Sequence, residues 1–100
     1  MQIEVRIVRV LRNIYDPEIP VNIYDLGLIY EVEVQEGGMV KITMTLTAPA
    51  CPMADQLVRE VHDQVLDIEG VEQVDVNLTF EPRWTKDMMS EEAKLDLGWF

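Results

Sequence analysis

The sequence predicts an α/β domain of the two-layer α+β kind, in which two helices cover one face of a three-stranded sheet. Two segments carry apolar residues at the spacing of an amphipathic helix, and three segments alternate apolar and polar residues as strands do. These segments follow one another in the order α-β-β-α-β, and a short helix is expected after them. Helices on one face of a sheet form two layers around one core.

The first helix is predicted near the N-terminus, where the apolar stripe consists of Ile3, Ile7, Val10, Leu11 and Ile14. Asp16-Pro17 ends it, because the residue before a proline avoids the helical region. The stretch DPEIPVNIYDLG then combines two prolines with an asparagine and a glycine. This composition is typical of a loop, and Gly27 is expected to form a tight bend into the first strand.

Two alternating segments follow, and Gly37-Gly38 between them is suited to a hairpin turn. The second helix is predicted to begin near Pro52 and to end at Gly70. The third strand contains the alternating residues Val74, Val76, Leu78 and Phe80. A right-handed crossover makes this strand parallel to the second strand, with either of the other strands as its neighbour.

One domain is expected over residues 1–100, with a core in residues 1–83 and a tail in residues 84–100. In the tail, Ser90 is a candidate N-cap for a short helix. Trp84, just beyond the third strand, could cover one end of the sheet or take part in an interface.

The composition restricts the partners and the location of the chain. Its 100 residues carry a formal charge of −11, which disfavours nucleic acid and anionic membranes and permits a basic protein partner. We find no apolar run long enough for a membrane helix and no signal-like segment. One cysteine excludes an internal disulfide framework. We therefore expect a soluble, cytoplasmic protein that binds neither nucleic acid nor membrane.

The single cysteine, Cys51, lies at or just before the N-cap of the second helix. The unpaired N–H groups at a helix start favour an anion, so the thiolate is favoured there, and thiolate is the form that binds metals. Pro49 and Pro52 restrict the backbone on both sides. A free cysteine is also commonly a small buried apolar residue. The spacing alone favours neither interpretation.

The sequence disfavours a zinc site within one chain and excludes a conventional all-cysteine cluster there. The only histidine, His62, is eleven positions along the same helix, roughly 16 Å from Cys51 at about 1.5 Å per residue. Zinc needs about four ligands, and an iron–sulfur cluster needs several thiolates. A cluster would therefore need further ligands from a second copy, a partner or a small thiol.

Three carboxylates in the first loop, Asp16, Glu18 and Asp25, form a second candidate site. They could bind a hard cation, or one could act as a base. Alternatively, Asp16 and Asp25 bond loop N–H groups, as such residues do in turns, and the pattern favours this interpretation.

Three motifs, DPEIPVNIYDLGLIYEV, TLTAPACPMAD and PRWTKDMMSEEAKLDLG, together resemble the SufT and PaaD-type family of metal–sulfur cluster biosynthesis proteins. Eukaryotic cytosolic iron–sulfur targeting factors carry a similar domain. The resemblance implies a fold similar to the C-terminal domain of NifU and a role in maturation or delivery of iron–sulfur clusters. It also implies that Cys51 is a reactive thiol near the DPE loop. The signature positions are Asp16, Pro17, Glu18, Asp25, Leu26, Gly27, Leu28, Thr47, Pro49, Cys51, Pro52 and Trp84.

Two differences from related proteins limit what the resemblance implies. PaaD-type proteins of aromatic-ring oxygenation pathways carry an added cysteine-bearing C-terminal region, whereas this sequence ends at Phe100. This difference disfavours a role in such a pathway. The CxxC pair with which the C-terminal domain of NifU holds a cluster is also absent, so cluster binding is not implied by the fold.

The resulting hypothesis is a non-enzymatic accessory factor that assists cluster assembly or delivery to client apoproteins. It would contact iron or an iron–sulfur cluster transiently through Cys51, without holding either stably in one chain. Its partners would be the assembly machinery and the clients, and a homodimer is a further expectation. The alternatives are an interaction module with an inert cysteine and a thiol-dependent enzyme, which would lack an evident base and a resolving cysteine.

Overall fold

The structure, a computed structural model, describes residues 3–16, 19–47 and 54–98. The helices and strands confirm the predicted order α-β-β-α-β and the short helix in the tail. In sequence order they are α1 (Ile3–Leu11), β1 (Ile29–Gln35), β2 (Met39–Met44), α2 (Ala54–Leu66), β3 (Gln73–Leu78) and α3 (Glu91–Leu97), with short 3₁₀ turns at Glu36–Gly38 and Lys86–Met88.

The three strands form one sheet in the order β1-β2-β3. β1 and β2 pair antiparallel, and β3 pairs with β2 in parallel, as the crossover predicts. The neighbour of the third strand, which the sequence left undecided, is therefore the second strand. Between β1 and β2, both Gly37 and Gly38 have a φ of 78°. This conformation suits glycine and explains the hairpin turn.

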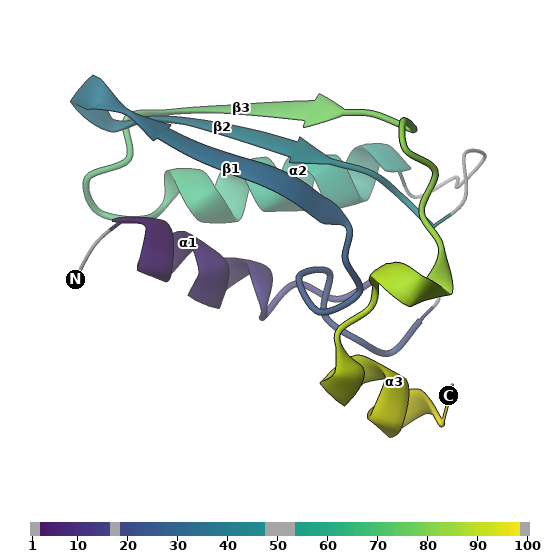
Figure 1. The fold of residues 1–100 in the computed structure, drawn as a ribbon. Coiled ribbons are helices and arrows are strands. Elements are labelled where there is room, and N and C mark those ends of the chain that lie inside the picture. Colours follow the sequence, from purple (N-terminus) through teal and green to yellow (C-terminus); the bar gives the residue numbers. More distant parts are fainter. Residues whose placement is uncertain (1–2, 17–18, 48–53, 99–100) are drawn as a thin grey trace.

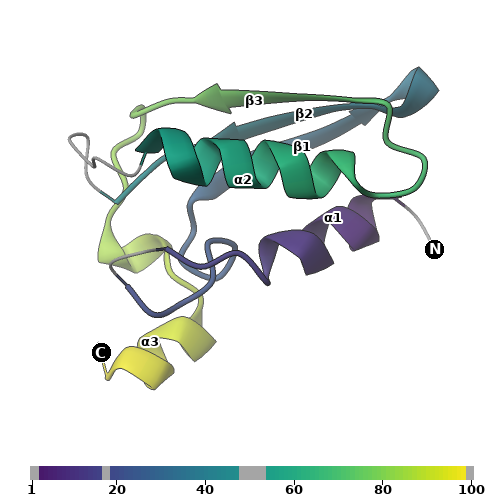
Figure 2. The same cartoon turned by 180° about the vertical axis from the view of Figure 1, so that it is seen from behind.

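In the described part of the chain, α1 and α2 lie on the same face of the sheet (Figure 1). The view from behind shows the same two layers (Figure 2). α2 packs against β3, and α1 packs against α2 and β1. The opposite face is polar, and its middle row places Lys41 in register between Glu33 and Asp75. Opposite charges in this arrangement favour the observed register.

The core lies between the sheet and the two helices. Val40, Ile42 and Met44 alternate along β2 and are buried toward the helix layer, as the strand pattern predicted. The helices contribute their apolar stripes, which include Ile7 and Leu11 from α1 and Val61 and Val65 from α2, all fully buried.

Three elements end earlier than the sequence suggested, and one of them is α2, which ends at Leu66 and not at Gly70. α1 ends at Leu11, and the side chain of Asn13 donates a hydrogen bond to the Arg9 carbonyl oxygen. Ile14 is nevertheless fully buried, because the loop after α1 directs it into the core. β3 ends at Leu78, since β2 already ends at Met44 and offers no longer partner strand.

The tail after β3 runs past the end of the sheet to α3, which lies beside the loop between α1 and β1 (Figure 1). Ser90 caps α3, as predicted, by accepting a hydrogen bond from the Ala93 N–H at 3.2 Å. Met89 and Ala93 are buried in the same apolar cluster as the sheet and helices. The tail therefore contributes to the core. Within the described residues, no helix has the length and apolar character needed to cross a membrane.

Candidate functional site

The candidate site lies at the end of the sheet where the loop after α1, the end of β2 and the start of α2 come together (Figure 1). Cys51, Pro49 and Pro52, as well as Pro17 and Glu18, lie outside the described residues. The structure describes the chain on both sides of each gap. Their placement in the site therefore remains a prediction, and the geometry below concerns the residues around them.

Asp16 is 7% exposed, and its side chain bonds to the described chain that follows the DPE motif. Its Oδ1 accepts a hydrogen bond from the Ile19 N–H at 3.0 Å. The Asp16 N–H approaches the Val21 carbonyl oxygen at 3.4 Å. The bond from the Ile19 N–H to the carboxylate is typical of aspartates in loops, and it supports the loop-bonding interpretation of Asp16.

Asp25 connects the loop to two other parts of the chain. Its Oδ2 accepts a hydrogen bond from the Asn22 side chain at 2.9 Å, and its N–H donates to the Asn22 Oδ1 at 2.8 Å. The Arg12 guanidinium, at the end of α1, lies 3.9 Å from the Asp25 Oδ1. The Asp25 carbonyl oxygen accepts from the Ser90 N–H at 2.8 Å. The bonds of Asp25 therefore shape the loop and join it to the start of α3.

Gly27 and Trp84 form the second connection between loop and tail. Gly27 has a φ of 83°, and a Cβ placed there would collide with the Met88 carbonyl oxygen. The Trp84 indole N–H donates a hydrogen bond to the Leu26 carbonyl oxygen at 2.7 Å. The sequence predicted the bend at Gly27, but it gave no signal that the tail packs onto it. Trp84 thus covers this end of the domain, and a role in an interface remains a prediction.

Thr45 is a residue of this region that the sequence analysis missed. It is fully buried, and its hydroxyl has no hydrogen-bond partner within the described part of the chain. Its N–H donates to the Leu28 carbonyl oxygen at 2.8 Å, which fixes it beside the loop. In the sequence, Thr45 is one of several threonines on the polar side of a strand. Only the packing of the loop against the end of β2 shows that it is buried, six positions before Cys51.

Among the side chains that the structure describes, no group of three histidine, cysteine or carboxylate residues is placed to hold a metal ion. His62 lies on α2 with its side chain 41% exposed, and its Nδ1 is 3.0 Å from the Asp63 Oδ1. His62 therefore lies at the surface of α2.

Comparison with known proteins identifies the chain. The profile of a family described as "Iron-sulfur cluster assembly protein" matches residues 4–77, which is more than half of the chain. The chain belongs to this family. The match includes the DPE, DLGL and CP motifs and confirms the resemblance inferred from them.

Relatives agree with the family over nearly the whole chain. A protein of Porphyromonas gingivalis named "Fe-S protein maturation auxiliary factor" is 60% identical over 98% of this chain and 93% of its own length. The "Fe-S protein maturation auxiliary factor SufT" of Staphylococcus aureus is 41% identical over 85% of this chain and 97% of its own length. A crystal structure of a domain of unknown function from Bacillus anthracis is 40% identical, with a TM-score of 0.89 over 96% of this chain and 92% of its own. This structural likeness confirms the α+β fold.

Proposed function

We propose that this chain is a non-enzymatic auxiliary factor in the maturation of iron–sulfur proteins. It works in the cytoplasm with the assembly machinery and client apoproteins, and the cluster is its cargo. The observation that carries the proposal is the family match over residues 4–77, together with relatives that bear this function in their names.

Cys51 is the residue proposed to contact the cargo. It is the only cysteine of the chain, and thiolate sulfur is the usual protein ligand of iron–sulfur clusters. One thiolate supplies too few ligands to retain a cluster, which suits a transient contact. In such a contact, a bond from iron to the Cys51 sulfur replaces a bond to a donor ligand. A client thiolate then displaces Cys51, and neither exchange changes the oxidation state of iron or sulfur.

Hydrogen bonds among the described loop residues support a fixed position for this contact. Asp16 bonds to the Ile19 N–H, which follows the DPE motif, and Asp25 and Gly27 attach the neighbouring loop to the tail. Thr47, which lies beyond the end of β2, leads into the residues that carry Cys51. Loops held by internal bonds keep a ligand position ready without a large ordering cost on binding.

The test uses cells that lack this protein and a client iron–sulfur enzyme whose activity is measured relative to its protein level. We expect Cys51→Ser to leave client activity at the level of cells without the protein, although the variant remains folded and normally abundant. Ala50→Ser is the matched control, since it adds a hydroxyl beside the thiol but keeps the sulfur. Full client activity with Cys51→Ser would refute the role of the thiol.

A parallel measurement addresses the cargo directly. After anaerobic incubation with ferrous iron and sulfide, we expect wild-type protein to acquire iron and sulfide only when a small thiol is supplied, with the accompanying visible absorbance. Cys51→Ser should acquire neither. Equal loading of both proteins would show that Cys51 is not the ligand and would favour the interaction module with an inert cysteine.

A further inference from the structure

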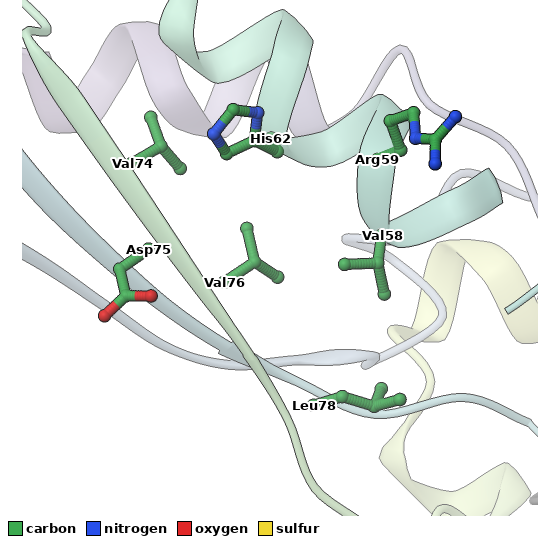
Figure 3. A pocket seen from close by; sticks show the side chains of 7 residues that line it. All are labelled: Val58, Arg59, His62, Val74, Asp75, Val76 and Leu78. Atoms are coloured by element: carbon green, nitrogen blue, oxygen red, sulfur yellow. The ribbon is translucent and has the colours of Figure 1, made fainter. Parts of the chain in front are cut away.

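A groove runs between α2 and the free edge of β3, on the helix face of the sheet (Figure 3). It has a volume of about 560 Å³. Val58 and His62 of α2 face the side chains of β3 across the groove, and Arg59 lies at its rim. The residues of this β3 groove are Val58, Arg59, His62, Val74, Asp75, Val76 and Leu78.

The backbone of β3 is paired on one side only, because β3 is at the edge of the sheet. Just after β3, the Thr79 N–H donates to the Met44 carbonyl oxygen of β2 at 2.9 Å. Backbone groups of successive strand residues point to opposite sides, so those of Val74, Val76 and Leu78 point away from β2. These are also the residues whose side chains line the groove. A strand added at this edge would therefore place alternate side chains into the groove.

Two features that often prevent pairing at an edge, proline and lysine, are missing from β3. Its sequence, QVDVNL, contains no proline and no lysine, and six residues are enough for a full strand pairing. Leu78 is 41% exposed, and Phe80 just beyond the strand is 36% exposed. An added strand would cover this apolar surface and bond the free backbone groups, which is the way extended peptides bind to sheet edges.

The charged residues around the groove determine which charge they attract on a partner. Arg59 stands on the helix side, where the side chains of an added strand would point. Asp75 points to the other face, where Lys41 is its register partner. The His62 Nδ1 lies 3.0 Å from the Asp63 Oδ1, so this ring already has an acidic partner. Arg59 is therefore the charged group that an added strand would meet on this side, and it favours a carboxylate.

The opposite edge of the sheet has the reverse character. A smaller groove of about 200 Å³ runs along β1, and its charged residues are acidic, Glu4 and Glu31. Its other lining residues are apolar or aromatic, and they include Tyr24 and Tyr30. A strand that carries a carboxylate would meet like charge at this edge and opposite charge at β3. The two edges thus differ in the partner that they can accept.

We propose that the β3 edge binds an extended segment of a partner protein, with apolar side chains and one carboxylate on the face that points toward α2. The segment becomes a fourth strand, and its carboxylate lies next to Arg59. The proposal uses other residues than the candidate cargo site and does not depend on the role of Cys51.

The test uses the full chain and a capped, fluorescein-labelled peptide about seven residues long, Thr-Leu-Thr-Glu-Thr-Leu-Thr, with a second peptide in which lysine replaces glutamate. Fluorescence anisotropy gives the affinities, and amide NMR shifts give the location. We expect the glutamate peptide to bind about tenfold more tightly and to shift the amides of Val74, Val76 and Leu78. Cys51→Ser should bind it equally well, which separates this proposal from the proposed cargo role.

Arg59→Glu should abolish the preference for the glutamate peptide, and Arg9→Glu is the control with the same charge change on exposed α1. The control should bind within about twofold of wild type, because its charge is away from the groove. Equal affinity for both peptides, no binding, or shifts confined to other residues would overturn the proposal. So would a dimer in sedimentation experiments that dissociates in Leu78→Asp, since a second copy would then occupy the edge.

Discussion

At one end of the sheet, segments far apart in the sequence form hydrogen bonds with one another. Along the edge of β3, by contrast, backbone N–H and C=O groups have no neighbouring strand to pair with. At that end of the sheet, which we call the closed end, loop residues 25–28 contact tail residues 84–90 and Thr45, which follows β2. Its contacts include the bond from the Trp84 indole to Leu26 and that from the Ser90 N–H to Asp25. The β3 edge instead carries half-exposed Leu78 and unpaired backbone.

This difference separates two tasks in a small domain. Bonds between loop and tail hold the closed end together. The β3 edge keeps polar and apolar groups available and so can recognise an extended partner. The closed end thus serves the stability of the fold, whereas the β3 edge is the surface proposed to bind a partner.

The largest effect is expected from Gly27→Ala at the closed end. An alanine at a φ of 83° is strained, and its Cβ would displace the Met88 backbone. Strain and displacement together should lower the free energy of unfolding by about 3 kcal/mol. Urea denaturation of the full chain measures this change.

Gly37→Ala is the matched control in the hairpin turn. Its φ of 78° is similar, but nothing lies within 4 Å of an added Cβ. We expect a loss of about 1 kcal/mol, from backbone strain alone. Equal losses in the two variants would show that the contact between Gly27 and the tail does not contribute to stability. The contrast between the closed end and the β3 edge would then lose its main support.

Features set by local spacing were predictable from the sequence. The stripe of α1, the alternation of β2 and the Ser90 cap depend on residues within a few positions of one another, and all are confirmed. The bend at Gly27 was also expected, because glycine in a loop before a strand indicates an unusual φ.

Features that depend on distant segments were not predictable. Trp84 and Leu26 are 58 positions apart, and no periodicity joins them. The burial of Thr45 arises only when the loop packs beside the end of β2, so its polar side chain suggested the exposed face. The position of β3 beside β2 likewise follows from packing of the crossover, which the order of elements leaves open. The role of Cys51 depends on the family motif and remains a prediction.

A smaller effect of opposite sign is expected from Thr45→Val at the closed end. Valine has nearly the same shape and removes a buried hydroxyl that has no partner in the described part of the chain. We expect a gain in the free energy of unfolding of about 1 kcal/mol, since the cost of burying that hydroxyl disappears. Thr43→Val, on the half-buried polar face, should change it by less than about 0.5 kcal/mol. A loss of stability in Thr45→Val would mean that the hydroxyl is bonded in solution.

The smallest effect on stability is expected at the edge, from Leu78→Ala. This side chain is 41% exposed and forfeits few contacts, so the loss should stay below about 1 kcal/mol. Leu28, at the closed end, is fully buried, and Leu28→Ala should lower the free energy of unfolding by about 3 kcal/mol. Binding of the glutamate peptide should respond differently. Leu78→Ala removes apolar surface from the groove and should weaken binding about fivefold. The opposite result is that Leu78→Ala destabilises the fold as much as Leu28→Ala and leaves peptide binding unchanged. That result would show that Leu78 stabilises the core and would contradict peptide binding at the β3 edge.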